Sequence, residues 1–370
     1  MDVLAFLTPS AEIARRKGPH DRIVMSSRIR LARNIREAAF PGWAKKAERI
    51  RVLDLIRPAV ESLPEMKDAF SEAMDNLATL DKQVLVERHL ISREHAAKSA
   101  GSGLVVNRDE TLSVMINEED HLRMQSLWPG LQLKQAWSAI DQVDTVLERH
   151  LDYAFNPDLG YLTACPTNIG TGIRVSAMLH LPGLVLAEQI NPIITSVSKL
   201  GLAVRGLYGE GTEALGNVFQ VSNQMTLGES EAAIVERLEK VLSQIIEHEE
   251  NARASLLEKK PKMVYNHIGR AYGILASAHI ISSKETMNLL SLMRLGVDLG
   301  LFPGVDRALV DELFILTQPA HLQKQHSERL SAEERDLLRA DMVRDRLKGV
   351  NRPAAKSPGE QRTGLDKPEK

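Results

Sequence analysis

Cysteine is almost missing from this chain, which has a single thiol, Cys165, in 370 residues. One cysteine excludes an internal disulfide framework, and it also excludes a zinc site built mainly from cysteine. Long apolar runs are missing too, since no stretch approaches the roughly 20 residues that cross a bilayer. The opening, MDVLAFLTPSAEIARRKG, has no cationic region before its short apolar run, so we expect no secretory signal. These absences predict a reduced, soluble protein of the cytoplasm.

Neither sign of charge dominates, because 47 Lys and Arg stand against 49 Asp and Glu. A chain built mainly to hold nucleic acid would show a clear basic excess, so we expect no direct nucleic-acid partner, and no membrane partner either. The remaining composition, 43% hydrophobic and 26% charged, is ordinary for a globular protein. The length exceeds that of a typical single core and favours one large domain with a smaller one.

Two familiar nucleotide-binding signatures are also absent. No GxxxxGK[ST] loop occurs, and the Gly-rich loop, HRD and DFG set of the common protein kinases is missing. If the protein uses a nucleotide, it holds the phosphates with arginine rather than with a lysine loop.

Hydrophobic periodicity divides the chain into a mixed region and a helical one. Strands are expected over 22–35, 82–92, 103–120, 159–166, 200–211 and 217–228, and helices over 44–80, 121–128, 131–150 and 173–190. Ser230 is expected to cap a further helix, whose apolar face holds Ile234, Leu238, Val241, Leu242 and Ile245. Strand signals stop beyond about residue 250, so the following region is predicted to be helical.

Arginines occur at positions that suit an anion. A strand period of two puts Arg28 and Arg30 of SSRIRLAR on one face and apolar residues on the other. Salt bridges to protein carboxylates are the simpler interpretation, but no acid lies on that face nearby in the sequence. Arg174 is expected at the start of a helix, where a cation makes sense mainly beside a bound anion. With Arg123 and Arg205, these side chains would suit a polyphosphate such as ATP.

Acidic residues in two short segments could provide a negatively charged site next to the arginines. INEEDH, residues 116–121, ends a predicted strand with Glu118, Glu119 and Asp120, and Glu210 lies between two glycines. Each of these could be no more than a solvated turn. A guanidinium substrate would need such groups, because its pKa lies above about 12 and its phosphorylation requires a carboxylate that orients the nitrogen and accepts a proton.

Cys165 stands immediately before Pro166 and the polar loop TNIGTG. A lone cysteine is more often a small buried hydrophobe. Its place at the start of this loop instead indicates a thiolate, whose pKa could be lowered by hydroxyl or N–H groups of CPTN. Such a thiolate would be a second negative partner for a guanidinium.

Five motifs occur in a fixed order: SSRIR, NEEDHLR, CPTNIGTGIR, RGLYGEG and SNQMTLGESE. They resemble the ATP:guanidino phosphotransferases, the family of the creatine and arginine kinases, over residues 24 to about 250. The text AYGILASAHIISSKETMNLL extends the resemblance to the bacterial protein arginine kinases over nearly the whole chain. The resemblance implies an α+β fold, in which a phosphagen-kinase-like catalytic domain, an antiparallel sheet flanked by helices, precedes an all-helical C-terminal domain.

The resemblance also implies domain limits and a dimer. We expect an N-terminal segment over 1–23, the catalytic domain over 24–254, a helical regulatory and dimerisation domain over 255–350, and a disordered tail over 351–370. The small-molecule kinases of the family carry a helical domain of roughly a hundred residues before their SSR motif, whereas here the motif begins at Ser26. Without that domain, the side of the site that receives the acceptor would be open. Such an opening would suit an arginine that is part of a protein.

Site residues follow from the resemblance position by position. The catalytic residues would be Glu119, Glu210 and Cys165. The ATP-binding residues would be Ser26, Ser27, Arg28, Ile29, Arg30, His89, Arg123, Arg174, Val175, Ser176, Ala177, Met178, Arg205, Gly206, Leu207, Tyr208, Gly209 and Glu210. Magnesium would be held through the ATP phosphates and not by a metal site of the protein itself.

An alternative interpretation stays open for His89, and the sequence departs from the family pattern at Val175 and Ala177. His89 matches a histidine that packs near the nucleotide base, although the sequence alone favours a surface position. The family's RASV is RVSA here, so Val175 and Ala177 are expected to change packing while Arg174 is kept.

A last motif lies in the helical region. RDLLRA puts Arg335 and Arg339 four residues apart, hence on one helical face, with Asp336 beside Arg335. By pattern alone this is a solvated charged face. It resembles the RDxxRA motif of the protein arginine kinases, which implies a regulatory phosphoarginine pocket of Arg335, Asp336, Arg339 and Ala340.

The function implied is transfer of the ATP γ-phosphoryl group to arginine side chains of proteins. The resemblance further implies an activator protein and a role in stress, marking proteins for a Clp ATPase and protease or inactivating a repressor. Two alternatives stay open: a kinase of free arginine or another small guanidino compound, and a non-catalytic adaptor that binds phosphoarginine. The acids, the thiol and the five arginines, all intact, speak against the adaptor.

Overall fold

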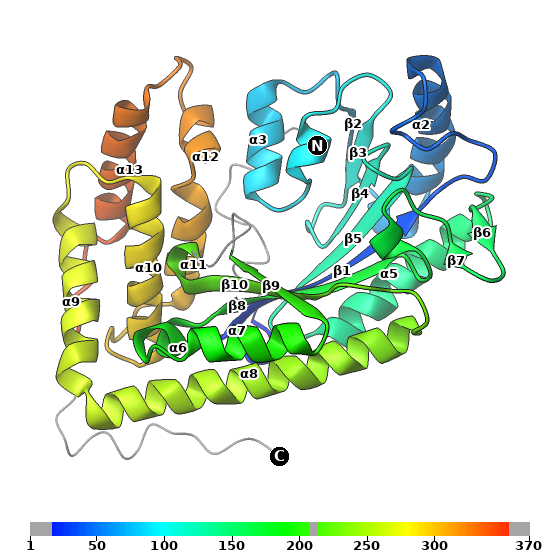
Figure 1. Ribbon diagram of the computed structural model, residues 1–370. Coiled ribbons are helices and arrows are strands. Elements are labelled where there is room, and N and C mark those ends of the chain that lie inside the picture. The colour runs from blue at the N-terminus through cyan, green and yellow to red at the C-terminus, as the bar shows by residue number, and fades with distance from the viewer. Residues whose placement is uncertain (1–16, 207–213, 355–370) are drawn as a thin grey trace.

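The computed structural model of the chain describes residues 17–206 and 214–354. Its centre is an eight-stranded antiparallel sheet in the order β2-β3-β4-β5-β1-β8-β10-β9 (Figure 1). The strands are β1 (Val24–Arg33), β2 (Phe70–Ala73), β3 (Gly103–Val106), β4 (Leu112–Ile116), β5 (Leu122–Pro129), β8 (Ile173–His180), β9 (Leu202–Gly206) and β10 (Val218–Asn223). A separate hairpin pairs β6 (Phe155–Asn156) with β7 (Gly160–Tyr161).

Helices flank the sheet on both faces and continue beyond it. They are α2 (Lys46–Glu61), α3 (Thr79–Glu87), α4 (Arg93–Ala96), α5 (Leu133–Glu148), α6 (Pro182–Leu186), α7 (Ile190–Lys199), α8 (Glu231–Lys259), α9 (Pro261–Ser277), α10 (Ser283–Asp298), α11 (Arg307–Leu316), α12 (Pro319–Lys324) and α13 (Ala332–Arg346). Helix α5 packs on β1 and β5, and α8 packs on β8 and β10. Figure 1 shows α8 running the length of the sheet.

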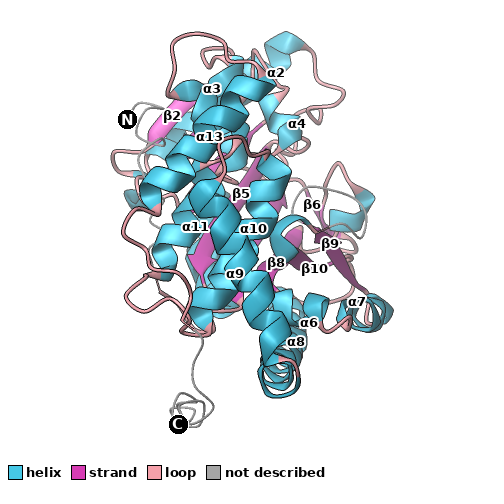
Figure 2. Cartoon of the chain, turned by 90° about the vertical axis from the view of Figure 1, so that its left-hand side faces the viewer, coloured by secondary structure: helices cyan, strands magenta, loops and turns pink. Residues whose placement is uncertain are grey.

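The last five helices form a second body, which lies to the left of the sheet in Figure 1 and in front of it in Figure 2. Their own apolar core includes Ile268, Leu290 and Leu313. An antiparallel sheet flanked by helices and followed by a helical region confirms the predicted α+β class. Among the described helices, none combines the length and the apolar character needed to span a membrane.

Helix α8 follows its predicted pattern. The Ser230 hydroxyl accepts a hydrogen bond from the Ala233 N–H at the N-cap, which satisfies a backbone donor that the first turn leaves free. All five residues expected on its apolar face are buried. The helix continues without a break past residue 254, so the limit between 254 and 255 stays a prediction, as do the other domain limits. Most of the two expected terminal segments lies outside the described residues.

Two of the central strands lie in segments that were predicted as helices. Residues 121–128 form most of β5, and 173–190 begin with β8 before the short α6. In β5, buried Leu122 and Met124 flank the less buried Arg123, which is the alternation of a strand. Strands β5 and β8 lie on either side of β1. Hydrogen bonding to β1 therefore outweighs the helical propensity of their Leu, Met and Ala residues.

Other predicted elements change type or shrink. Residues 82–92, predicted as a strand, belong to α3 and the loop after it. Their run of Val84, Leu85 and Val86 suits either structure, since a short apolar run cannot separate strand from helix. The helix predicted over 44–80 is limited to α2 and is followed by β2, and the strand predicted over 159–166 pairs only at β7.

A buried ion pair joins β1 to the helix beneath it. Arg33 is 1% exposed and donates to Oδ2 of Asp144 on α5, from Nε at 3.0 Å and from Nη2 at 2.6 Å. Its Nη1 donates to the Thr171 carbonyl at 2.8 Å, and its guanidinium carbon lies 3.6 Å from the centre of the Tyr161 ring. The pair therefore fixes the loop that follows Cys165 to the end of β1.

Replacement of Asp144 by alanine tests this anchor. The change leaves the Arg33 charge buried without a carboxylate, so we expect the free energy of unfolding to fall by roughly 3–5 kcal/mol. Urea unfolding followed by circular dichroism measures the loss. Asp141→Ala, an exposed aspartate on the same helix, is the control and should stay within about 0.5 kcal/mol of the parent. Equal midpoints for both variants would contradict the role given to the pair.

Candidate active site

The register of the central strands gathers arginines on one face of the sheet. Arg30 of β1 lies opposite Arg174 of β8. Arg123 of β5 lies opposite Ala32, two residues from Arg30. Opposite residues share a face, and so do residues two apart along a strand, so Arg28, Arg30, Arg123 and Arg174 lie on the face away from α5 and α8.

The fifth arginine reaches the same face through two more strands. Arg205 of β9 lies opposite Gln220 of β10, and Gln220 lies opposite Met178 of β8, four residues from Arg174. The structure thus brings together the five arginines that the sequence singled out. The expectation that Arg174 begins a helix is wrong, because it lies in β8. Arg174 is close to the other arginines because its strand pairs with β1, and not because of a helix dipole.

Within residues 17–206 and 214–354, no carboxylate forms an ion pair with Arg28, Arg30 or Arg174. Arg28 donates from Nη2 to the amide oxygen of Gln220 at 2.8 Å, and Arg174 donates from Nη1 to the Asn223 carbonyl at 2.6 Å. The Nε of Arg30 is buried, with no hydrogen-bond partner within the described part of the chain. Arg123 differs, since its Nη1 lies 2.6 Å from Glu118 Oε2. The salt-bridge interpretation therefore holds for Arg123 and fails for Arg28 and Arg30.

The uncompensated charge shows in the pKa values. Burial and then the charge of Arg123 lower the pKa of Arg28 to about 10. Burial, with Arg28, Arg123 and Arg174 nearby, holds the pKa of Arg30 well below its ordinary value. Burial and the charge of Arg205 lower the pKa of Arg174. An anion bound on this face would relieve the repulsion.

Alternation splits the two continuous runs predicted to bind ATP. Ser26, Ser176 and Met178 share the face of the arginines. The side chains between them point to the core face, which holds Ser27, Ile29, Val175 and Ala177. The Ser27 hydroxyl donates to the Gly130 carbonyl at 2.8 Å and accepts from the Gln132 N–H at 2.9 Å, so it fixes a turn.

Of the remaining predicted ATP-binding residues, only Gly206 belongs to a described strand end. Val175 and Ala177 are core residues, so any packing change that the RVSA variation makes is expected beneath the arginines. Gly206 is buried at the end of β9. Leu207, Tyr208, Gly209 and the predicted catalytic Glu210 lie outside the described residues.

The acids of the β4–β5 turn have different surroundings. Glu118 is 1% exposed and accepts hydrogen bonds from Arg123, from the Ser92 hydroxyl at 2.5 Å and from the Glu119 N–H at 3.0 Å. Burial alone would raise its pKa, but Arg123 and Ser92 bring the pKa of Glu118 below its ordinary value. Glu118 is therefore the anchor of Arg123, a role that sequence reasoning missed.

Glu119 is the open carboxylate of the turn. Its side chain is 46% exposed, and its Oε2 lies 3.8 Å from Arg123 Nη1. Partial burial and the neighbouring Asp120 raise the pKa of Glu119 above its ordinary value. A carboxylate with a raised pKa beside a cationic face suits a proton acceptor.

Asp120 joins the acidic turn to the thiol loop. It is 1% exposed, and its Oδ1 accepts from Asn34 Nδ2 at 2.6 Å and from the Ala164 N–H at 2.7 Å. Asn34 also donates to the Leu162 carbonyl at 3.0 Å. Neither residue was predicted to have this role, and the one sequence signal was a polar Asn34 at the end of an alternating strand. These bonds tie the residue after Glu119 to the residue before Cys165.

Cys165 is partly exposed and unpaired, which excludes a purely apolar buried role. Its Sγ lies 3.1 Å from the Thr167 hydroxyl, a group that can donate to a thiolate. Cys165 and Glu119 both lie within electrostatic range of Arg174, at the same end of the arginine face.

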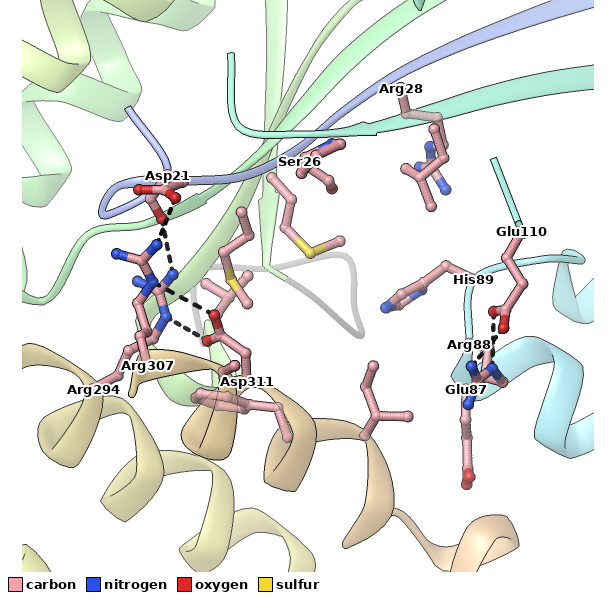
Figure 3. A pocket seen from close by; sticks show the side chains of 18 of the residues that line it. Asp21, Ser26, Arg28, Glu87, Arg88, His89, Glu110, Arg294, Arg307 and Asp311 are labelled. Atoms are coloured by element: carbon pink, nitrogen blue, oxygen red, sulfur yellow. Dashed lines mark hydrogen bonds and ion pairs between the residues drawn. The ribbon is translucent and has the colours of Figure 1, made fainter. Parts of the chain in front are cut away.

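His89 follows α3 and lines a cleft at the opposite end of the arginine face, together with Ser26, Arg28 and Met178 (Figure 3). Its backbone has a positive φ of 60°, and its carbonyl accepts from Gln125 Nε2 at 2.8 Å. Burial and the charge of Arg28 lower the pKa of His89 to about 4, so the ring is neutral near pH 7. His89 is partly buried in this cleft, whereas the sequence alone favoured a surface position.

The predicted phosphoarginine residues lie on α13. Arg339 is 1% exposed and donates to the carbonyls of Thr317 at 2.8 Å and Ile281 at 2.9 Å, and it pairs with Asp336. Arg335 is partly exposed and donates to the Leu330 carbonyl at 2.7 Å. Ala340 is buried in the helical core. The four residues therefore form no single exposed face.

Within residues 17–206 and 214–354, no cluster of three or more His, Cys, Asp or Glu could hold a metal ion. The donor set of the site is one of arginines, which match phosphate oxygens, and not one of metal ligands.

Comparison with known proteins agrees with this chemistry. Residues 51–252 match the family model of the ATP:guanido phosphotransferase C-terminal catalytic domain, and residues 261–358 match that of the protein-arginine kinase McsB C-terminal domain. The chain is 47% identical to the protein-arginine kinase of Halothermothrix orenii, over 90% of this chain and 95% of that protein. It is 46% identical to that of Bacillus subtilis, over 90% and 92%.

A solved structure, that of lombricine kinase, matches with a TM-score of 0.56 and 26% identity, over 65% of this chain and 71% of that one. The chain therefore belongs to the ATP:guanido phosphotransferase family and, within it, to the protein-arginine kinases.

Proposed function

We propose that the protein transfers the γ-phosphoryl group of ATP to arginine side chains of other proteins. The observation that carries the proposal is the convergence of five arginines on one sheet face that ends at Glu119 and Cys165. The arginines match a polyphosphate, and the two acidic groups match a guanidinium. The names of the relatives that share 46–47% identity with the chain support the same acceptor.

The arginine face would bind the triphosphate of ATP. Arg28, Arg30, Arg123, Arg174 and Arg205 would donate to its oxygens, and Mg²⁺, held through these phosphates, would neutralise further charge. Since the buried Nε of Arg30 has no hydrogen-bond partner among residues 17–206 and 214–354, a phosphate oxygen there would satisfy this donor.

The acceptor guanidinium would lie between Glu119 and Cys165. Its nitrogen attacks the γ-phosphorus in line, the bond from that phosphorus to the β,γ-bridging oxygen breaks, and ADP leaves. The proton of the attacking nitrogen passes to Glu119, while a Cys165 thiolate holds the other side of the guanidinium. We carry over Glu210 as a second carboxylate from the resemblance alone. Catalysis would come mainly from positioning and charge compensation.

We extend the proposal to regulation and partners. Arg335 and Asp336 would receive the phosphoryl group and the guanidinium of a phosphoarginine, with Arg339 and Ala340 forming the base of that pocket. The resemblance to protein-arginine kinases also supports a cytoplasmic homodimer that works with an activator protein and a Clp ATPase and protease, in stress or protein quality control.

Labelled phosphate should enter protein rather than free arginine. With [γ-³²P]ATP and an unfolded acceptor such as casein, we expect acid-labile label in the protein band. The same acceptor with its arginines blocked by a dicarbonyl reagent should stay unlabelled. Label in added free arginine, and none in either protein, would favour the small-guanidino alternative; no label in any acceptor would favour the adaptor.

Glu119→Gln should remove the proton acceptor while keeping the size of the side chain. We expect kcat to fall by roughly 10²- to 10⁴-fold, with the Kd for ATP within about twofold of the parent. Initial rates and isothermal titration calorimetry measure the two effects. Glu94→Gln, an exposed glutamate on the adjacent α4, is the matched control. A Glu119→Gln protein with parental kcat would remove Glu119 from the mechanism.

Arg335→Ala tests the proposed regulatory pocket without opening the internal bonds of Arg339. Loss of a charge-assisted contact should weaken the binding of phosphoarginine by roughly tenfold or more. Calorimetry with free phosphoarginine gives the Kd, and Arg329→Ala, an exposed arginine before α13, is the control. Equal affinities for the two variants would place the ligand elsewhere.

A further inference from the structure

The cleft beside His89 has walls from two distant parts of the chain (Figure 3). One wall is the sheet, where Met25, Met178, Leu127 and Val218 supply apolar surface. The other wall is α11 of the C-terminal helices. Its lining residues are Ala308, Asp311, Phe314 and Ile315. Their spacing of three to four residues marks one face of the helix.

Ion pairs and hydrogen bonds hold that helical face in place. Arg294 of α10 is 1% exposed; its Nε donates to Asp311 Oδ1 at 2.7 Å, and its Nη atoms donate to the carbonyls of Asp21 at 3.0 Å and Arg22 at 2.9 Å. Arg307, at the start of α11, lies 2.7 Å from Asp21 Oδ2. Asp21 and Arg22 lead directly into β1. The wall is therefore fixed to the beginning of the strand that carries Arg28 and Arg30.

The direction of β1 sets which part of ATP can reach the cleft, given the proposed function. Ser26, Arg28 and Arg30 follow one another on the arginine face, and Asn34, bonded to Asp120, marks the end where the acceptor lies. The γ-phosphate must lie at that end to meet the acceptor. Since β1 advances about 3.4 Å per residue, the adenosine end points back toward Ser26, which lines the cleft.

The chemistry of the cleft suits a nucleoside. Small-molecule sites are mainly apolar with a few placed polar groups. Here the methionines of the sheet face Ile315 and Phe314, while a neutral His89 and the Ser26 hydroxyl provide polar contacts. The carboxylate of Asp311 is paired with Arg294, and Arg307 lies 3.6 Å from it, so it adds no uncompensated charge.

We propose that α11 forms the second wall of the adenosine site, so that the C-terminal helices take part directly in binding ATP. Ile315 and Ala308 contact the nucleoside, and the sheet arginines hold only the phosphates. The proposal rests on the proposed function in one respect, that ATP lies on the arginine face.

Ile315→Ala tests the proposal, because Ile315 is partly exposed in the cleft whereas Phe314 packs against Gly216 in the interior. Loss of apolar contact with the nucleoside should raise the Kd for Mg–ATP by roughly five- to tenfold. The Kd for Mg–tripolyphosphate, which lacks the nucleoside, should be unchanged. Isothermal titration calorimetry measures both. Leu309→Ala, on the same helix but packed against the helical core, is the control and should leave both values unchanged.

Ala308→Phe provides an independent, filling variant. It should weaken ATP by at least tenfold, with tripolyphosphate binding and the thermal midpoint of the parent retained. Unchanged ATP affinity in both cleft variants overturns the proposal, and so does an equal loss for ATP and tripolyphosphate. A parent protein that binds tripolyphosphate but not ATP also overturns it. A parent that binds neither refutes the proposed function itself, so the two failures are distinguishable.

Discussion

The antiparallel pairing of β1 with β5 and β8 is the interaction on which the site depends. It brings Arg28, Arg30, Arg123 and Arg174 together from three separate stretches of the chain. Burial and mutual repulsion then lower the pKa values of Arg28 and Arg30, so the free protein holds charge at an unfavourable density. The opposite face offsets this, since Ile29, Leu31 and their neighbours are buried against α5 and α8. The result is a stable sheet with one face prepared for an anion.

The same strand orders the chemistry along its length. Its first residues follow a loop tied to α10 and α11, its middle carries the arginines, and its end meets the acidic turn and the thiol loop through Asn34. With the proposed function, nucleoside, phosphates and acceptor would follow one another along β1, which would position the acceptor for transfer. The buried carboxylate of Asp120 accepts a hydrogen bond from the Ala164 N–H. This bond connects the thiol loop to the turn that carries Glu119, the proposed proton acceptor.

Sequence reasoning recovered the parts of the site that depend on local pattern. The alternation of SSRIRLAR correctly put Arg28 and Arg30 on one face, and Ser230 correctly marked the start of α8. Sequence reasoning failed where pairing with a neighbouring strand determines the conformation of a segment. Residues 121–128 and 173–180 are good helix formers that become strands because β1 lies between them. Arg174 was expected beside an anion because of a helix terminus, but it lies in β8 and shares its face with the other arginines.

Contacts between distant segments were beyond sequence reasoning altogether. The pairing of Glu118 with Arg123 could not be told from a solvated turn, and nothing local links Asn34 to Asp120. Arg339 looked like an exposed partner of Arg335, but its guanidinium satisfies two carbonyls inside the helical body. The cleft lies between the sheet and α11, so it could not be predicted without knowing how the sheet domain and the C-terminal helices pack together.

A crystal structure with Mg²⁺, a non-hydrolysable ATP analogue and an arginine-containing peptide is the most direct measurement. The account predicts phosphate oxygens within about 3 Å of the arginine face and the peptide guanidinium between Glu119 and Cys165. A triphosphate bound away from Arg28, Arg30 and Arg174, or a guanidinium remote from Glu119, would contradict it.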